Sequence, residues 1–216
     1  MSTFPGSPKL VKGGIVLIDP ETAAVKRIIT LQYNPDSITR TLQVKGNAED
    51  GERSEALRLK GPPVETIKLE AEIDATDQLE TAEVGTVSAG IHTQLAALET
   101  MVYPESRQML ANNSLARSGT LEIAPMQASL ALFIWSKARI LPVKITEFSV
   151  TEEAFDVNLN PLRARVTLGL RVLSVDDLGF DHKGGVLFMN YQQNKERLAA
   201  MLTSGSLDSL GIGEIP

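Results

Sequence analysis

Residues 158–172 read NLNPLRARVTLGLRV, and beyond the proline they alternate apolar with polar or small side chains. Alternation with a period of two is typical of a strand with one buried face. The positions expected to face the core are Ala164, Val166, Leu168, Leu170 and Val172. The positions expected to face outward are Arg163, Arg165, Thr167, Gly169 and Arg171. These residues predict a strand with one dry face and one face that carries arginines.

The segment before this strand predicts its partner in the sheet. Residues 142–150 are rich in β-branched side chains, and their polar and apolar positions change parity around Glu147. An extra residue in one strand, a β-bulge, produces such a change. We therefore expect two long strands joined by a turn over residues 151–161, with a bulge near Glu147.

Further strands are expected along the rest of the chain. They cover residues 14–18, 25–32, 38–44, 64–74, 121–123 and 130–135. The strand at residues 64–74 alternates regularly, which puts the acidic Glu70, Glu72 and Asp74 on its outer face. The strand at residues 130–135 is apolar on both faces, so we expect it in the middle of the sheet or at a subunit contact.

Two helices are expected. From residue 86 to residue 103 the apolar side chains recur at helical spacing, and Pro104 then ends the helix. Residues 106–120 show no period and are expected to be irregular, and residues 179–185 predict a turn. The expected organisation is an arm at residues 1–12, a β domain at residues 13–174, and an extension at residues 175–216 with an amphipathic helix over residues 187–202.

Composition excludes several classes of function. A chain of 216 residues with 43% hydrophobic residues can bury the core of a single domain. A net charge of −6 provides no basic field for a nucleic-acid backbone, so we expect no nucleic-acid partner. The absence of cysteine excludes disulfides and thiolate metal sites. No signal peptide or apolar run of membrane-spanning length is evident, so we expect assembly in the cytoplasm and no membrane insertion.

No residue pattern predicts catalysis. The only histidines, His92 and His182, are far apart in the sequence, and isolated histidines are normally structural or exposed. The adjacent carboxylates at Glu152–Glu153 and Asp176–Asp177 point apart on a strand and lack a third group for acid–base work or for holding a metal. No phosphate-binding loop or nucleophile elbow is present. The expectation is a protein that is not an enzyme and binds no cofactor or metal.

Five short motifs occur in a fixed order. They are LQYNP at residues 31–35, MVYP at 101–104, FIW at 133–135, TEEAF at 151–155 and LNPLRA at 159–164. Their order and spacing resemble the tube-type proteins of contractile injection systems, the phage-tail-like particles of bacteria, and more narrowly the inner-baseplate branch. The resemblance covers about residues 12–174. It implies a mainly β fold, a β-barrel or sandwich with one flanking helix, and a hexameric ring between a trimeric spike and the inner tube.

The resemblance also suggests which residues meet partners. A ring of identical subunits needs two complementary surfaces on each copy, and opposite charges on two strands fit that need. The candidate interface residues are Glu70, Glu72, Asp74, Arg163, Arg165 and Arg171. Alternatively, these charges solvate the sheet or pair within one subunit, because exposed ion pairs contribute only about 0 to 1 kcal/mol each.

A polar segment at residues 45–61 is longer than the usual loop of a compact domain. It is either a solvated loop or a segment that becomes ordered on a partner. By position it matches the extended hairpin with which tube-type proteins reach the adjacent ring. The candidate ring-stacking residues are Glu49, Asp50, Gly51, Glu52, Arg53 and Glu55.

One departure concerns attachment to the outer baseplate. Many inner-baseplate proteins carry a C-terminal LysM module that binds the surrounding wedge, and no LysM-like pattern follows Ser174. Extensions at both ends favour a tube-initiating adaptor, in contact with spike, tube and wedge proteins, over a repeated tube subunit. A small-molecule-binding β-barrel and a cell-wall hydrolase are the rival classes. Whether the particle is released, anchored at a membrane or kept in the cell stays open.

Overall fold

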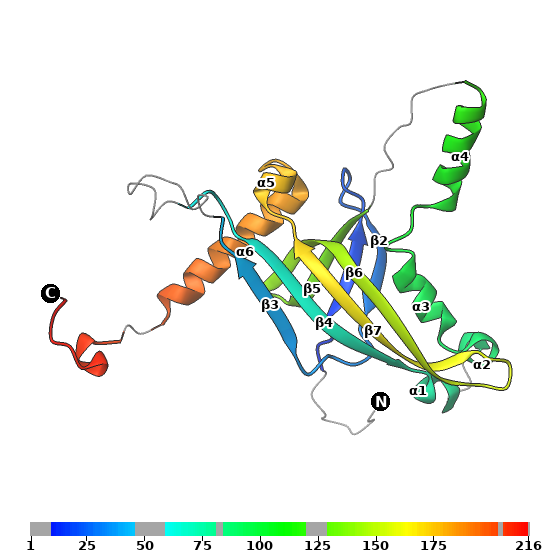
Figure 1. Ribbon diagram of the computed structural model, residues 1–216, viewed down its shortest axis with the longest axis horizontal. Coiled ribbons are helices and arrows are strands. Elements are labelled where there is room, and N and C mark those ends of the chain that lie inside the picture. Colours follow the sequence, from blue (N-terminus) through cyan, green and yellow to red (C-terminus); the bar gives the residue numbers. More distant parts are fainter. Residues whose placement is uncertain (1–9, 46–58, 81–83, 120–128, 203–204, 216) are drawn as a thin grey trace.

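The fold is built on a single antiparallel sheet, seen in a computed structural model that describes residues 10–45, 59–80, 84–119, 129–202 and 205–215 (Figure 1). Seven strands follow the order β2-β1-β5-β6-β7-β4-β3. Their bounds are β1 (Gly14–Ile18), β2 (Val25–Thr30), β3 (Ile38–Gln43), β4 (Val64–Asp74), β5 (Leu130–Ser136), β6 (Arg139–Phe155) and β7 (Pro161–Val172). The mainly β prediction is confirmed, and the strands expected at residues 14–18 and 64–74 have the predicted bounds. The strand expected at residues 121–123 lies outside the described residues.

The sheet curves strongly but does not close. β2 and β4 are separated by four strands in the sheet order. Nevertheless the side-chain amide of Gln32, just after β2, exchanges two hydrogen bonds with the backbone of Asp74 at the end of β4, at 2.7 and 3.0 Å. The sheet therefore wraps around a core, while β2 and β3 are its two edges among the strands that the structure describes.

The β6–β7 hairpin confirms the predicted bulge. The register between the two strands shifts between Ile145 and Glu147, where an extra residue enters β6. Gly169 lies opposite Glu147, and a Cβ at that position would come within 2.8 Å of the Glu147 Cβ. Glycine thus makes room for the bulge.

The turn of this hairpin is shorter than predicted. β6 continues to Phe155, so that only residues 156–160 connect the two strands. The Asp156 carboxylate explains the difference, because its Oδ1 accepts hydrogen bonds from the backbone N–H groups of Asn158 and Asn160 at 2.7 and 2.8 Å. An aspartate whose carboxylate accepts hydrogen bonds from the backbone N–H groups that follow it in the sequence closes a tight turn.

The helices differ more from expectation. Their bounds are α1 (Thr76–Glu80), α2 (Val84–Ala89), α3 (His92–Glu99), α4 (Ser106–Arg117), α5 (Val175–Leu178) and α6 (Lys183–Ala200), followed by a 3₁₀ helix, η2 (Leu207–Leu210). The single helix expected over residues 86–103 is wrong, since α2 and α3 are separate and α3 ends at Glu99. Gly90 interrupts it with a φ of +57°, and the Ile91 N–H donates to the Pro161 carbonyl of β7 instead of continuing the helix.

Residues 106–120 were expected to be irregular, and that prediction is also wrong. Residues 106–117 form α4, which buries no side chain against the rest of the described chain. A helix without a buried face needs no apolar period, which is why no helical pattern is visible in these residues. The helix predicted at residues 187–202 is confirmed in type, but α6 starts earlier because the His182 ring accepts a hydrogen bond from the Gly184 N–H and caps it.

The main core lies on the inner face of the curved sheet. All five apolar residues predicted to be inside on β7 are at most 3% exposed. Helices close the core, with Ile91, Leu95 and Leu98 on one side and Phe188 and Tyr191 of α6 on another (Figure 1). β5 lies between β1 and β6, and its second face packs in a smaller cluster with Leu178 and Leu187. The central position predicted for this doubly apolar strand is confirmed.

Candidate assembly interface

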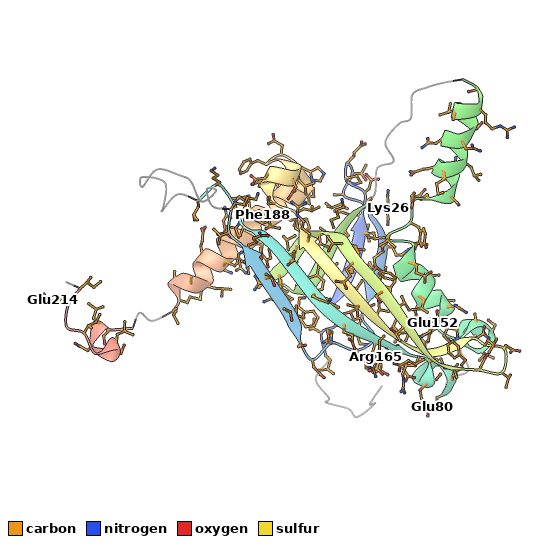
Figure 2. All side chains as sticks on the ribbon, in the orientation of Figure 1. Lys26, Glu80, Glu152, Arg165, Phe188 and Glu214 are labelled. Carbon is orange, nitrogen blue, oxygen red and sulfur yellow. The ribbon has the colours of Figure 1, made fainter. Side chains whose placement is uncertain are left out.

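The acidic and basic residues proposed for a subunit interface lie on neighbouring strands of one sheet. β4 pairs with β7, and the register places Glu72 opposite Arg165 and Asp74 opposite Arg163. Arg165 and the nearby Glu152 lie toward the hairpin end of the sheet (Figure 2). Directly opposite residues of opposite charge stabilise a strand pair by about 0.2 to 1 kcal/mol.

Ion pairs within the chain use most of these charges. Arg163 lies 2.7 Å from Asp74 and 3.7 Å from Glu72, while Arg171 lies 2.6 Å from Asp177. Arg165 lies 3.5 Å from Glu153. Among the described residues, Glu70 has no ion-pair partner. The structure therefore brings the six candidate residues to one face, and their role between subunits stays a prediction.

The candidate ring-stacking residues, Glu49, Asp50, Gly51, Glu52, Arg53 and Glu55, lie outside the described residues.

Asp74 is the most buried member of this set, at 9% exposure. Burial disfavours its charge, but hydrogen bonds from the Thr76 hydroxyl and backbone N–H and from the Arg163 guanidinium outweigh it. The pKa of the Asp74 carboxyl is therefore lowered below its ordinary value. Its backbone also carries the two hydrogen bonds to Gln32, so this residue joins β4, β7 and the segment after β2.

A pH dependence follows from Asp74. Because its folded pKa is lowered, ionised Asp74 stabilises the fold above the unfolded pKa of about 3.9, and this contribution is lost as the pH falls through the folded pKa. We expect the free energy of unfolding to decrease below about pH 4, and to decrease less steeply in Asp74→Asn. Urea denaturation between pH 6 and pH 2.5 measures both slopes. Equal slopes in the two proteins would contradict this assignment.

A second ionic cluster holds α6 on the sheet, and the sequence analysis missed it. Glu65 on β4 is 3% exposed, and its Oε1 lies 2.6 Å from an Arg40 nitrogen. The same carboxylate oxygen accepts from the Tyr191 hydroxyl at 3.3 Å, while the Lys195 Nζ lies 3.9 Å from Oε2 and 4.3 Å from the centre of the Tyr191 ring. Burial and Glu65 raise the pKa of Tyr191. The sequence contained a signal for this cluster, because Glu65 is two residues from Ile67 and the alternation of the strand therefore places it on the inner face of β4.

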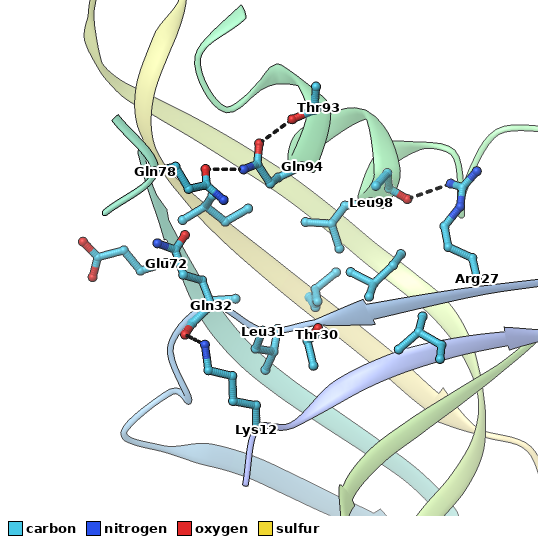
Figure 3. Close-up of a pocket in the computed structure, with 16 residues that line it drawn as sticks. Lys12, Arg27, Thr30, Leu31, Gln32, Glu72, Gln78, Thr93, Gln94 and Leu98 are labelled. Carbon is cyan, nitrogen blue, oxygen red and sulfur yellow. Dashed lines mark hydrogen bonds between the residues drawn. The ribbon is translucent and has the colours of Figure 1, made fainter. Parts of the chain in front are cut away.

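A groove opens beside the free edge of β2, where the sheet does not close. It lies between β2, β4 and α3 and has a volume of about 460 Å³ (Figure 3). Leu31, Ile73, Leu98 and Leu168 provide apolar lining, and Lys12 and Arg27 also line it. The Lys12 ammonium donates to the Gln32 carbonyl at 2.8 Å, and Arg27 donates to the Ala97 carbonyl at 3.2 Å. We call this the β2 groove.

Most of the residues considered for catalysis have structural partners. His92 begins α3 and is exposed, and His182 caps α6. Asp176 lies 2.7 Å from Lys45, and Asp177 pairs with Arg171 and completes the cap of α5. Within the described ranges no group of three His, Cys, Asp or Glu residues could hold a metal ion.

Comparisons with known proteins gave no family assignment. No protein-family model matches the chain, and no curated protein matches its sequence. Function therefore has to be inferred from the residues and their placement. In the part of the chain that the structure describes, no helix combines the length and hydropathy needed to cross a bilayer.

Proposed function

We propose that this chain is a structural protein of a contractile injection system, which forms a hexameric ring at the inner baseplate between the spike and the tube. The observation that carries the proposal is the open, curved sheet with two free edges. On the edge strand β2, Val25 and Ile28 are 60% and 66% exposed. An edge strand with unpaired backbone groups and exposed apolar side chains is a template for pairing with another chain.

The sequence resemblance supplies the identity of that other chain. In the assembled ring, neighbouring copies cover the free edges and complete the barrel that tube-type proteins are expected to have. The ring then presents a template on which the inner tube polymerises, and it travels with the tube when the sheath contracts. Contacts that run through a closed ring of identical subunits distribute the axial load of this movement.

The charged residues are assigned roles within this ring. Glu70, Glu72, Asp74, Arg163, Arg165 and Arg171 form the charged surface near the contact between subunits. Glu70 offers a charge without an ion-pair partner among the described residues, and Arg165 is half exposed despite Glu153. The polar segment that contains Glu49 to Glu55 reaches the adjacent ring. Helix α6 and the chain after it take the place of a LysM module in binding the wedge proteins.

One observation favours a second candidate. The β2 groove has a volume within the range of about 300 to 1,000 Å³ that is usual for small-molecule sites, and part of its lining is apolar. A small-molecule-binding β-barrel would therefore bind an apolar ligand saturably as a monomer. The ring and the repeated tube subunit both require self-association instead.

Electron microscopy of the purified chain, alone and mixed with the spike and tube proteins of its own system, tests the proposal. We expect six-fold rings, and tubes that start from them when tube protein is present. A chain that remains monomeric with both partners, at micromolar concentration, would contradict the proposal. Rings that stack on themselves into long tubes without a separate tube protein would favour the repeated tube subunit.

A further inference from the structure

The tip of the β6–β7 hairpin presents apolar side chains to water. Phe155, Val157 and Leu159 are 50%, 99% and 78% exposed. The tip, residues 155–159, extends past α2 at the edge of the molecule (Figure 1). Val157 and Leu159 bury little of their surface on folding, and Phe155 leaves half of its surface in water, so all three would gain further from burial against another surface.

The tip is also held in one shape. Besides the two backbone hydrogen bonds to its Oδ1, the Asp156 carboxylate accepts a hydrogen bond from the Asn160 side chain at 2.8 Å. Ala154 and Leu159 adopt left-handed φ values of 52° and 63°, which cost energy for residues other than glycine. Because the turn is preorganised, little conformational entropy is lost when the tip binds.

The β2 groove provides a matching surface elsewhere on the same chain. Leu31, Ile73, Leu98 and Leu168 contribute apolar lining. Lys12 and Arg27 have no carboxylate within ion-pair distance among the described residues, and they donate hydrogen bonds to carbonyl and hydroxyl oxygens instead. The hairpin carries the opposite charge near its tip, where Glu152 is exposed and has no ion-pair partner in the described chain. Glu72 also lines the groove, but it lies 3.7 Å from Arg163, so Lys12 and Arg27 keep a positive charge that it does not pair with. The tip and the groove thus complement each other in polarity and charge.

We propose that the hairpin tip of one copy inserts into the β2 groove of the next copy, with Glu152 approaching Lys12 and Arg27. Because the tip and the groove lie at different places on the chain, the contact is head-to-tail, and repeated contacts of this kind close into a ring when the rotation permits. The inference rests on the proposed ring and identifies one contact within it. A second copy is the favoured occupant because it offers the apolar tip and the complementary charge together.

Cysteine cross-linking tests this contact, since the chain contains no cysteine. Val157→Cys places a thiol at the tip, and Thr30→Cys places one on β2 beside the groove (Figure 3). Under ring-forming conditions with a mild oxidant, the double variant should give a ladder of covalent multimers on a non-reducing gel. Val157→Cys combined with Thr41→Cys is the matched control, because Thr41 is an exposed strand threonine on β3 that does not line the groove.

Val157→Asp gives an independent readout without cross-linking. Its side chain is almost fully exposed, so we expect the same free energy of unfolding as the wild type. A charge placed in an apolar contact should weaken self-association about tenfold or more, measured by analytical ultracentrifugation.

The outcomes separate the contact from the proposed function. Rings without preferential cross-linking of the Val157→Cys, Thr30→Cys protein would overturn the contact and leave the ring intact. Preferential cross-linking together with an absence of rings in the presence of spike and tube proteins would support the contact and overturn the ring. A monomer whose groove binds a small apolar molecule would overturn both.

Discussion

Replacing Gly90 by alanine should lower the free energy of unfolding by about 3 kcal/mol or more. Gly90 has a φ of +57°, and a Cβ there would lie 2.2 Å from the Pro161 carbonyl oxygen. Neither the left-handed backbone nor the β7 backbone atom can be avoided by rotating a side chain. Relief requires the α2–α3 junction to move away from β7, and that breaks the hydrogen bond from the Ile91 N–H to Pro161.

Gly85→Ala is the matched control for this effect. Gly85 lies in α2, and a Cβ there would meet no atom within 4 Å. Alanine in a helix is favoured over glycine by about 0.5 to 1 kcal/mol, so this variant should be neutral or slightly more stable. Urea denaturation of both variants gives the comparison. Equal stability of Gly90→Ala and the wild type would show that the junction does not depend on this close approach.

Replacing Glu65 by glutamine should cost about 2 to 4 kcal/mol of unfolding free energy. The change keeps the shape of the side chain but removes the charge that Arg40 and Lys195 face. Because the Arg40 side chain is 27% exposed, water can partly solvate its charge, and the loss of unfolding free energy should be smaller than for a fully buried ion pair. We expect helix α6 to loosen first, because Tyr191 and Lys195 lie on it.

The Glu65 prediction is checked by the free energy of unfolding of Glu65→Gln, compared with that of a control variant, and by the pKa of Tyr191. Glu147→Gln is the control, since the Lys68–Glu147 pair at 3.2 Å is about half exposed on both sides and should contribute at most about 1 kcal/mol. The pKa of Tyr191, followed by tyrosinate absorbance, should fall in Glu65→Gln because one of the causes that raise it is removed. A Glu65→Gln protein as stable as Glu147→Gln would contradict the role assigned to this cluster.

The sheet could be predicted from the sequence better than the helices, because the alternation that marks a strand lies within the strand itself. Strand β7 alternates apolar and polar residues without interruption, and the parity change at Glu147 marks the bulge that the register contains. The helical break at Gly90 depends on a contact with Pro161, which is distant in the sequence, so the period of the apolar residues could not reveal it. Helix α4 was missed because it buries nothing.

The placement of the charged residues shows a further limit. The sequence left open whether Glu72, Asp74, Arg163 and Arg165 meet a partner or pair within one subunit, and it did not show that β4 and β7 are neighbours. Alternating opposite charges on two strands are also the signature of cross-strand pairs, which was the available signal. The exposed Val157 and Leu159 were visible in the sequence as apolar residues within a turn. Only the structure places the β2 groove, because β2 and β4 are brought together by the curvature of the whole sheet.

The most direct test of the central claim is electron microscopy of intact contractile particles in which this chain carries a label at its C-terminus. We expect the label at a single level of the particle, between the spike and the first ring of the tube, with six-fold symmetry about the axis. A label distributed along the whole tube would identify the repeated subunit instead. Particles that assemble and contract without containing the labelled chain would contradict the account.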